Sequence, residues 1–261
     1  MTDVYMLISN PPHPEADLQQ AAPCFETTAA ELRMRLNYRS SVIWFAGEEL
    51  TPLRETATTL QHAGVRVRLI KGRSLAALSQ RHELKMFAFG PSGLQLRVEN
   101  DKTFEVPYDW SVASVMCRPM ETEHISRLPA KTATPNKSFR QDATTKIGDI
   151  HEPVDQKFVD MYFFKLPSVH RVTIRPGACD FSGLGDAMKP VVNENINTLL
   201  QELQTRFASV RDDRRLDNLP VPRPKLINGK TLESQLELAD PSLRDIDPYD
   251  LLSRLAFLSG A

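Results

Sequence analysis

The alternation of hydrophobic and polar positions between Thr27 and Ile70 predicts a helix, a strand, a second helix and a second strand in succession. In the first helix the capping box from Thr28 to Glu31 would supply side-chain partners for backbone N–H groups of the first turn. Val42 to Ala46 is a continuous apolar run, which is typical of a buried strand. Apolar residues at helical spacing form the buried face of the first helix, namely Phe25, Ala29, Leu32 and Leu36.

The second helix and strand carry boundary signals of their own. Pro52 suits the first helical position because proline lacks only an N–H that has no intrahelical partner there. Gly64 would end this helix in the left-handed conformation. Val65 to Ile70 alternates apolar and basic residues, which predicts a strand with one solvent-exposed face. With a strand over Val4 to Ser9 and a short helix over Pro14 to Ala22, the order becomes strand, helix, helix, strand, helix, strand.

This order resembles the C-terminal domain of the bacterial ribosomal stalk protein. The similarity is clearest over Glu48 to Leu69, where an acidic helix start, a Leu-x-x-x-Ala-x-x-Leu face, an Ala-Gly stop and an alternating strand follow one another. It implies a ferredoxin-like, stalk-protein-like α/β unit over residues 1–70. The stalk family contacts translation factors through a lysine-rich, glycine-containing helix pair. The corresponding helix here has Arg33, Arg35 and Arg39 without the glycine, so no binding residues are carried over.

Three short alternating segments after Lys85 predict an appended antiparallel β-meander. They are Met86 to Phe89, Leu94 to Val98, and Thr103 to Pro107. The phrase Tyr108-Asp-Trp-Ser, followed by Val112 to Cys117, resembles small bacterial pleckstrin-like domains, and this resemblance covers residues 85–118. Trp110 could contact a ligand or lipid, or close a small hydrophobic core, and we favour the core because a large aromatic area usually serves packing.

The composition changes between Glu121 and Gln156, where apolar residues become sparse and no periodicity remains. A segment of this length without regular structure indicates a linker between domains. We therefore expect an α+β protein with four parts. They are the α/β unit plus β-meander over residues 1–120, a flexible linker over 121–156, a second small α+β domain over 157–218, and an extended tail over 219–261 that ends in an amphipathic helix.

The most distinctive string is the glycine-rich segment from Gly177 to Gly185. It could be a tight turn that needs positive φ angles, or a site where backbone N–H groups hold an anion. The anion site is the less favoured reading, because no lysine follows at phosphate-loop spacing. The candidate ligand-binding residues are Asp180, Ser182, Gly183, Gly185 and Arg175, and an enzyme using this turn could employ Arg171 instead of Arg175.

The chain ends in a short amphipathic helix that begins near Asp247 and Pro248. A helix of about twelve residues is marginal alone, so it must pack on its own protein or in a groove of a partner. Packing on its own protein is favoured. The candidate partner-binding residues, should the partner alternative hold, are Leu251, Leu252, Leu255 and Phe257.

Composition narrows the function classes. A formal net charge of -1 gives no field that would attract nucleic acid, and the charged run from Arg211 to Asp217 is interpreted as a solvated surface of weak ion pairs. No apolar run reaches the length of a membrane span, and the N-terminus lacks an export signal, so we expect a cytoplasmic protein. The three cysteines and six histidines show no metal-ligand spacing. No cofactor, metal or catalytic residue is therefore predicted.

These observations favour a non-catalytic adaptor or regulatory protein that recognises another protein through exposed sheet edges or the terminal helix. The alternative is an enzyme or sensor that acts on an anionic or phosphorylated small molecule at residues 177–185. The identity of the partner, and whether the chain associates with copies of itself, are left open by the sequence.

Overall fold

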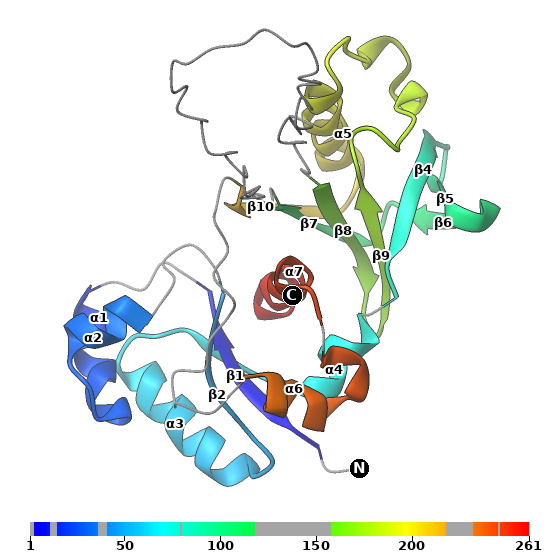
Figure 1. Ribbon diagram of the computed structural model, residues 1–261. Coiled ribbons are helices and arrows are strands. Elements are labelled where there is room, and N and C mark those ends of the chain that lie inside the picture. Colours follow the sequence, from blue (N-terminus) through cyan, green and yellow to red (C-terminus); the bar gives the residue numbers. More distant parts are fainter. Residues whose placement is uncertain are drawn as a thin grey trace, which may run out of the picture.

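The computed structural model describes residues 3–10, 15–35, 41–78, 80–117, 158–217, 232–244 and 246–260. It has the mixed helix and strand content of an α+β fold, as the sequence predicted, arranged around two separate sheets (Figure 1). The predicted linker at 121–156 and the first part of the tail lie outside the described residues. Within the described ranges no helix is long and apolar enough to cross a membrane.

The smaller sheet has three antiparallel strands in the order β2-β1-β3. Its elements are β1 (Tyr5–Ser9), α1 (Glu15–Ala21), a 3-10 turn η1 (Ala22–Phe25), α2 (Ala29–Arg35), β2 (Val42–Gly47), α3 (Leu50–His62), β3 (Val67–Lys71) and α4 (Gly72–Ala77). Helices α1, α2 and α3 bury apolar side chains against this sheet, around Trp44. The strands and helices that the sequence predicted here are present, although Phe25 lies in η1 rather than in α2, and Leu36 lies outside the described residues.

Local signals explain why these elements start and stop where they do. The N–H of Glu31 donates to the hydroxyl of Thr28, and the N–H of Thr28 donates to the carboxylate of Glu31, which confirms the predicted capping box. Gly64 follows α3 with a φ of 86°, and its N–H donates to the carbonyl of Gln61. Glycine adopts this conformation without a steric penalty, so the predicted helix end is also confirmed.

The larger sheet has seven strands in the order β10-β7-β8-β9-β4-β5-β6. The strands are β4 (His82–Phe89), β5 (Gly93–Val98), β6 (Thr103–Pro107), β7 (Ser111–Cys117), β8 (Phe158–Lys165), β9 (Ser168–Ile174) and β10 (Ser209–Leu216). The 3-10 turn η2 (Glu99–Asp101) connects β5 to β6. The predicted β-meander is present as β4-β5-β6, and a second antiparallel meander is formed by β7-β8-β9.

This sheet joins strands that the sequence had assigned to two separate units. β7 pairs with β8 from Ser111 to Cys117, and β4 runs parallel to β9 at its start. The strands of residues 157–218 therefore do not form a small domain of their own but complete the sheet of residues 82–117. The division expected from the sequence differs from the structure because β7 and β8 are neighbours in the sheet, although residues 118–157 separate them in the chain. The charged run that begins at Arg211 is also a strand, because β10 pairs with β7.

Two helices cover opposite faces of the larger sheet (Figure 1). Helix α5 (Val192–Arg206), which follows the 3-10 segment η3 (Ser182–Ala187), packs its apolar side on one face. Helix α7 (Pro248–Gly260) packs on the other face and also contacts β1 and β3, so it lies between the two sheets. The tail is less extended than expected, because α6 (Leu232–Ala239) and the 3-10 turn η4 (Pro241–Leu243) bury Leu232, Leu236 and Leu243 in the same core.

The larger sheet curls at its β6 end. Phe104 of β6 lies 5.5 Å from the ring of His170 on β9, although β4 and β5 separate these two strands in the sheet. The curl buries the inner faces of β4, β5 and β6 in the same hydrophobic core as α5. The outer faces of these three strands are left facing solvent.

Candidate functional site

The glycine-rich turn is held against β4. The N–H of Asp180 donates to the carbonyl of Lys85 at 2.7 Å, and the carboxylate of Asp180 accepts from the N–H and the hydroxyl of Ser182 at 2.8 and 3.0 Å. A side chain at Gly183 would overlap the carbonyl oxygen of Phe87, and Gly185 has a φ of 54°. Gly183 thus allows the turn to pack closely against β4, and Gly185 allows the backbone to turn. The N–H of Ser182, which an anion would need, already bonds a carboxylate of the chain.

Arg175 does not complete an anion site with these residues. Its guanidinium lies 5.6 Å from the ring centre of Phe158, and no contact of this group with Asp180 or Ser182 is found in the described structure. The structure therefore brings Asp180, Ser182 and Gly183 together as a structural turn and leaves Arg175 outside it.

The terminal helix packs on its own chain, which is the alternative that the sequence favoured. Leu251, Leu252, Leu255 and Phe257 are each at most 2% exposed. The ring of Phe257 stacks on Tyr162 of β8 at 4.3 Å, and the hydroxyls of Tyr162 and Ser253 are 2.8 Å apart. These side chains are therefore covered by the protein itself and present no surface to a partner in this structure.

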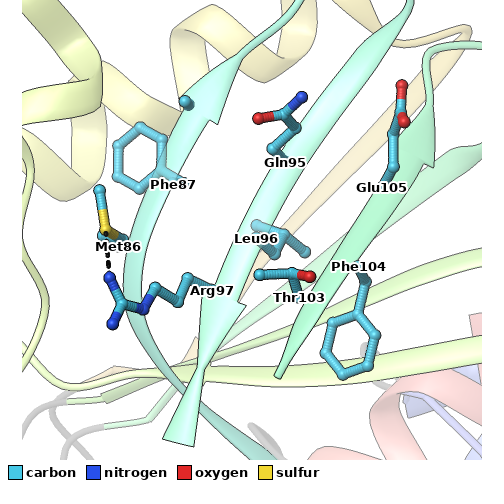
Figure 2. A pocket seen from close by; sticks show the side chains of 9 residues that line it. Met86, Phe87, Gln95, Leu96, Arg97, Thr103, Phe104 and Glu105 are labelled. Atoms are coloured by element: carbon cyan, nitrogen blue, oxygen red, sulfur yellow. Dashed lines mark hydrogen bonds between the residues drawn. The ribbon is translucent and has the colours of Figure 1, made fainter. Parts of the chain in front are cut away.

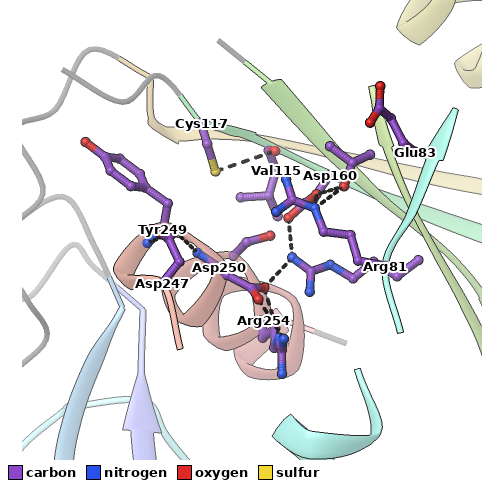
Figure 3. A network of polar contacts seen from close by, with 12 residues as sticks. Arg81, Glu83, Val115, Cys117, Asp160, Asp247, Tyr249, Asp250 and Arg254 are labelled. Carbon is purple, nitrogen blue, oxygen red and sulfur yellow. Dashed lines mark hydrogen bonds and ion pairs between the residues drawn. The ribbon is translucent and has the colours of Figure 1, made fainter. Parts of the chain in front are cut away.

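Helix α7 is fixed by a buried network of alternating charges (Figure 3). The carboxylate of Asp160 on β8 accepts hydrogen bonds from Arg171 and Thr173 of β9, and Nε of Arg81 lies 3.4 Å away. Arg171 also contacts the carboxylate of Asp250 on α7 at 2.6 Å, and Asp250 in turn binds Arg254 at 2.6 Å. The network thereby ties the larger sheet to the helix.

Burial and charge have opposite effects on Asp160. Burial favours the neutral acid, but Arg171, Arg81 and the hydrogen bond from Thr173 outweigh it and hold the pKa of this carboxyl below its ordinary value. The carboxylate is therefore ionised at neutral pH and compensated by its own chain. Fixed, paired charges of this kind orient a helix, but they are not poised to transfer a proton.

A second line of polar and aromatic side chains lies on the opposite face of the sheet. The imidazole of His170 is stacked between Trp110 and Phe104, with ring centres 5.4 and 5.5 Å away, and the ring of His82 is 5.1 Å from Phe104. The half-buried indole of Trp110 thus packs within the protein, as the core interpretation predicted. His170 and Asp160 lie on opposite faces of the sheet, and Asp180 lies in the turn beside β4. These three ionisable residues therefore do not come together in one cleft, as the groups of a catalytic site would.

The far edge of the sheet, at β6, is open as far as the described residues go. β6 pairs with β5, and no strand of the described chain pairs with its other side. The N–H of Val98 donates to the carbonyl of Lys102, and the N–H of Tyr108 to the carbonyl of Ser92. In an antiparallel ladder the bonding direction alternates from residue to residue. The even-numbered residues of β6 therefore bond β5, and the N–H groups of Thr103 and Glu105 point toward the open edge.

A hollow of about 410 Å³ lies beside this edge, on the outer face of β4, β5 and β6 (Figure 2). Cross-strand neighbours line it in two rows, one of Met86, Arg97 and Thr103 and one of Ala88, Gln95 and Glu105. Arg97 is bound to Asp101 through Nε and Nη2, at 3.0 and 2.6 Å. Glu105 accepts a hydrogen bond from the hydroxyl of Ser92 at 3.0 Å.

β6 is held in place from its inner side. Phe104 inserts between His82 and His170, and Val106 is fully buried. In the preceding turn the carboxylate of Glu99 accepts from the N–H of Glu83 and lies 3.6 Å from His82. The open backbone groups of this strand are therefore positioned before any partner arrives.

Sequence reasoning predicted β6 but not that it forms an edge, since an edge depends on which strands pair. It also missed the network around Asp160. The signal was present, because an aspartate within the apolar run from Phe158 to Phe164 would be costly to bury without a partner. Comparisons with known proteins give no further guidance: no family model, no curated protein and no solved structure matches this chain.

Proposed function

We propose that this protein binds another protein by adding an extended segment of that partner to the free edge of β6. The observation that carries the proposal is the pair of outward backbone positions at Thr103 and Glu105, on a strand that is fixed from its inner side. Addition of a strand to a sheet edge is a recurring mode of peptide recognition, in which main-chain hydrogen bonds supply affinity. In this proposal, the β6 edge of the larger sheet is the binding surface of the adaptor or regulatory protein expected from the sequence.

The opposite edge of the larger sheet, at β10, is protected in ways that natural sheets commonly use. β10 carries five consecutive charged residues from Arg211 to Arg215 and a register shift after Asp213. β6 has a single charged residue, Glu105, and ends at Pro107. It is thus the less protected of the two edges of the larger sheet in the described structure.

An enzyme or sensor at residues 177–185 has less support. The carboxylate of Asp180 occupies the N–H of Ser182, and Arg175 lies elsewhere. A negative side chain in the turn opposes the binding of an anion.

The proposal is tested with the full chain and a random-peptide phage library. Peptides selected on the wild-type chain are synthesised, and their affinities are measured by calorimetry for the wild type, Glu105→Pro and Glu105→Ala. Proline removes the outward N–H of residue 105 but no bond to β5, whereas alanine removes only the side chain. We expect the selected peptides to bind Glu105→Pro at least about tenfold more weakly than Glu105→Ala. The proline variant loses the hydrogen bond from the N–H of residue 105 to the added strand, and its ring keeps that strand from approaching closely.

Thermal melting of both variants provides the control for folding, because neither change removes a backbone hydrogen bond of the sheet and both remove the same side-chain bond to Ser92. Equal affinity of the selected peptides for the proline and alanine variants, or a failure to select any peptide, would refute binding at β6.

A further inference from the structure

The charge distribution beside β6 indicates what kind of segment it accepts. We infer that the bound segment carries a lysine or arginine opposite Glu105. This inference rests on the proposed function of the β6 edge and specifies the chemistry of the partner.

Glu105 has a negative charge that its surroundings leave uncompensated. Its one hydrogen bond is from the neutral hydroxyl of Ser92, and within the described chain it has no ion-pair partner. The cation lining the same hollow, Arg97, is bound by two of its nitrogens to Asp101. Asp101 thus compensates the charge of Arg97, which leaves the carboxylate of Glu105 as the uncompensated charge among the residues that line the hollow.

The geometry of the edge places the complementary charge. Side chains directly opposite each other on neighbouring antiparallel strands have Cβ atoms about 5 Å apart. The side chain of an added residue opposite Glu105 would lie over the same face as the hollow. Behind Glu105 the next cross-strand neighbour is Gln95, whose side-chain amide has no hydrogen bond in the described structure. A long cationic side chain can reach both the carboxylate of Glu105 and the amide oxygen of Gln95.

A second copy of this chain fits the edge less well. Antiparallel pairing of two β6 strands centred on Glu105 would set two carboxylates opposite each other, which is destabilising. Pairing centred on Phe104 would set Thr103 opposite Glu105 and leave both carboxylates without a cation. A basic segment of another protein supplies the missing charge in either strand direction.

The experiment compares peptides selected from the random-peptide library on the wild-type chain with peptides selected on Glu105→Lys. Lysine keeps the backbone N–H and a long side chain and reverses only the charge. We expect a lysine or arginine to be enriched at one aligned position for the wild type, and an aspartate or glutamate at that position for Glu105→Lys. Peptides selected on the wild type should bind Glu105→Lys about 1.4- to fivefold more weakly, because a cross-strand pair contributes ~0.2 to 1 kcal/mol.

The outcomes separate this inference from the function on which it rests. One outcome is that the selected peptides lose affinity for Glu105→Pro, show no preference for a basic residue and bind Glu105→Lys as tightly as the wild type. This would refute the inference of a basic residue opposite Glu105 but would leave the β6 edge as the binding site. Peptides that are insensitive to Glu105→Pro would refute both. Concentration-dependent self-association of the wild type that disappears in Glu105→Pro, measured by light scattering, would show that a second copy occupies the edge.

Discussion

Replacement of Asp160 by asparagine tests whether the buried network stabilises the fold as its geometry indicates. The Asp160 side chain is fully buried and contacts Arg171, Thr173 and Arg81. Asparagine has nearly the same shape but no charge, so Arg171 and Arg81 would lose their shared counter-ion. Removal of one partner from a buried ion pair costs ~3 to 5 kcal/mol. Arg171 retains Asp250, so we expect a loss near 3 kcal/mol at pH 7.

The pH dependence provides a second, independent signature. The pKa of Asp160 is lowered in the folded protein, so its contribution is complete above the unfolded pKa of ~3.9 and is lost as the pH falls through the folded value. The free-energy gap between the wild type and Asp160→Asn should therefore be constant from pH 7 to pH 5 and shrink below about pH 4. Acidic residues outside this network titrate in both proteins and cancel in the difference.

Urea unfolding followed by tryptophan fluorescence measures this gap at each pH. Asp109→Asn is the matched control, because Asp109 and its partner Lys165 are 61% and 62% exposed and such pairs contribute less than ~1 kcal/mol. A loss below about 1 kcal/mol for Asp160→Asn, or a gap that does not change between pH 7 and pH 3, would refute the reasoning. Replacement of both Asp160 and Arg171 by apolar residues should cost less than the single change, because no unpaired charge remains.

Three further changes test packing contacts elsewhere in the protein, each by urea unfolding. Gly183→Ala should destabilise by more than ~1 kcal/mol, because its methyl group would overlap the Phe87 carbonyl, whereas Gly177→Ala, with open space around it, should change stability little. Leu255→Ala should cost ~2.7 to 5 kcal/mol, since Leu255 is fully buried between the two sheets; a loss under 1 kcal/mol would contradict this position of α7. Asn195→Ala should cost ~1 to 3 kcal/mol, because the buried amide bonds both the N–H and the carbonyl of Lys189; an unchanged midpoint would show that these bonds contribute nothing.

The sequence predicted those parts of the fold that local chemistry determines. The capping box at Thr28, the stop at Gly64 and the three strands of the meander each depend on residues a few positions apart, and each is present. The same holds for the terminal helix, whose leucines repeat at helical spacing and pack on the protein itself.

The parts that were not predicted depend on distant residues. The parallel pairs β4–β9 and β7–β10 join segments far apart in the chain, and no local pattern specifies which strands meet. β10 was missed because its run of charges is atypical of a strand, although Asp213 within it is buried with its partner Arg215. The candidate site was missed for a related reason: Thr103 and Glu105 are ordinary strand residues until the strand order leaves them at an edge.

The pairing of β7 with β8 also bears on how the protein folds. Cys117 and Phe158 are cross-strand partners, so the two ends of the segment 118–157 lie at adjacent positions of the sheet. Closing a loop of about 40 residues costs ~2 kcal/mol more in chain entropy than closing a loop of four. A chain in which a short hairpin turn replaces residues 118–157 should therefore refold faster, with the order of the sheet unchanged. The same junction is the natural place to insert a reporter domain, because its two ends already lie side by side.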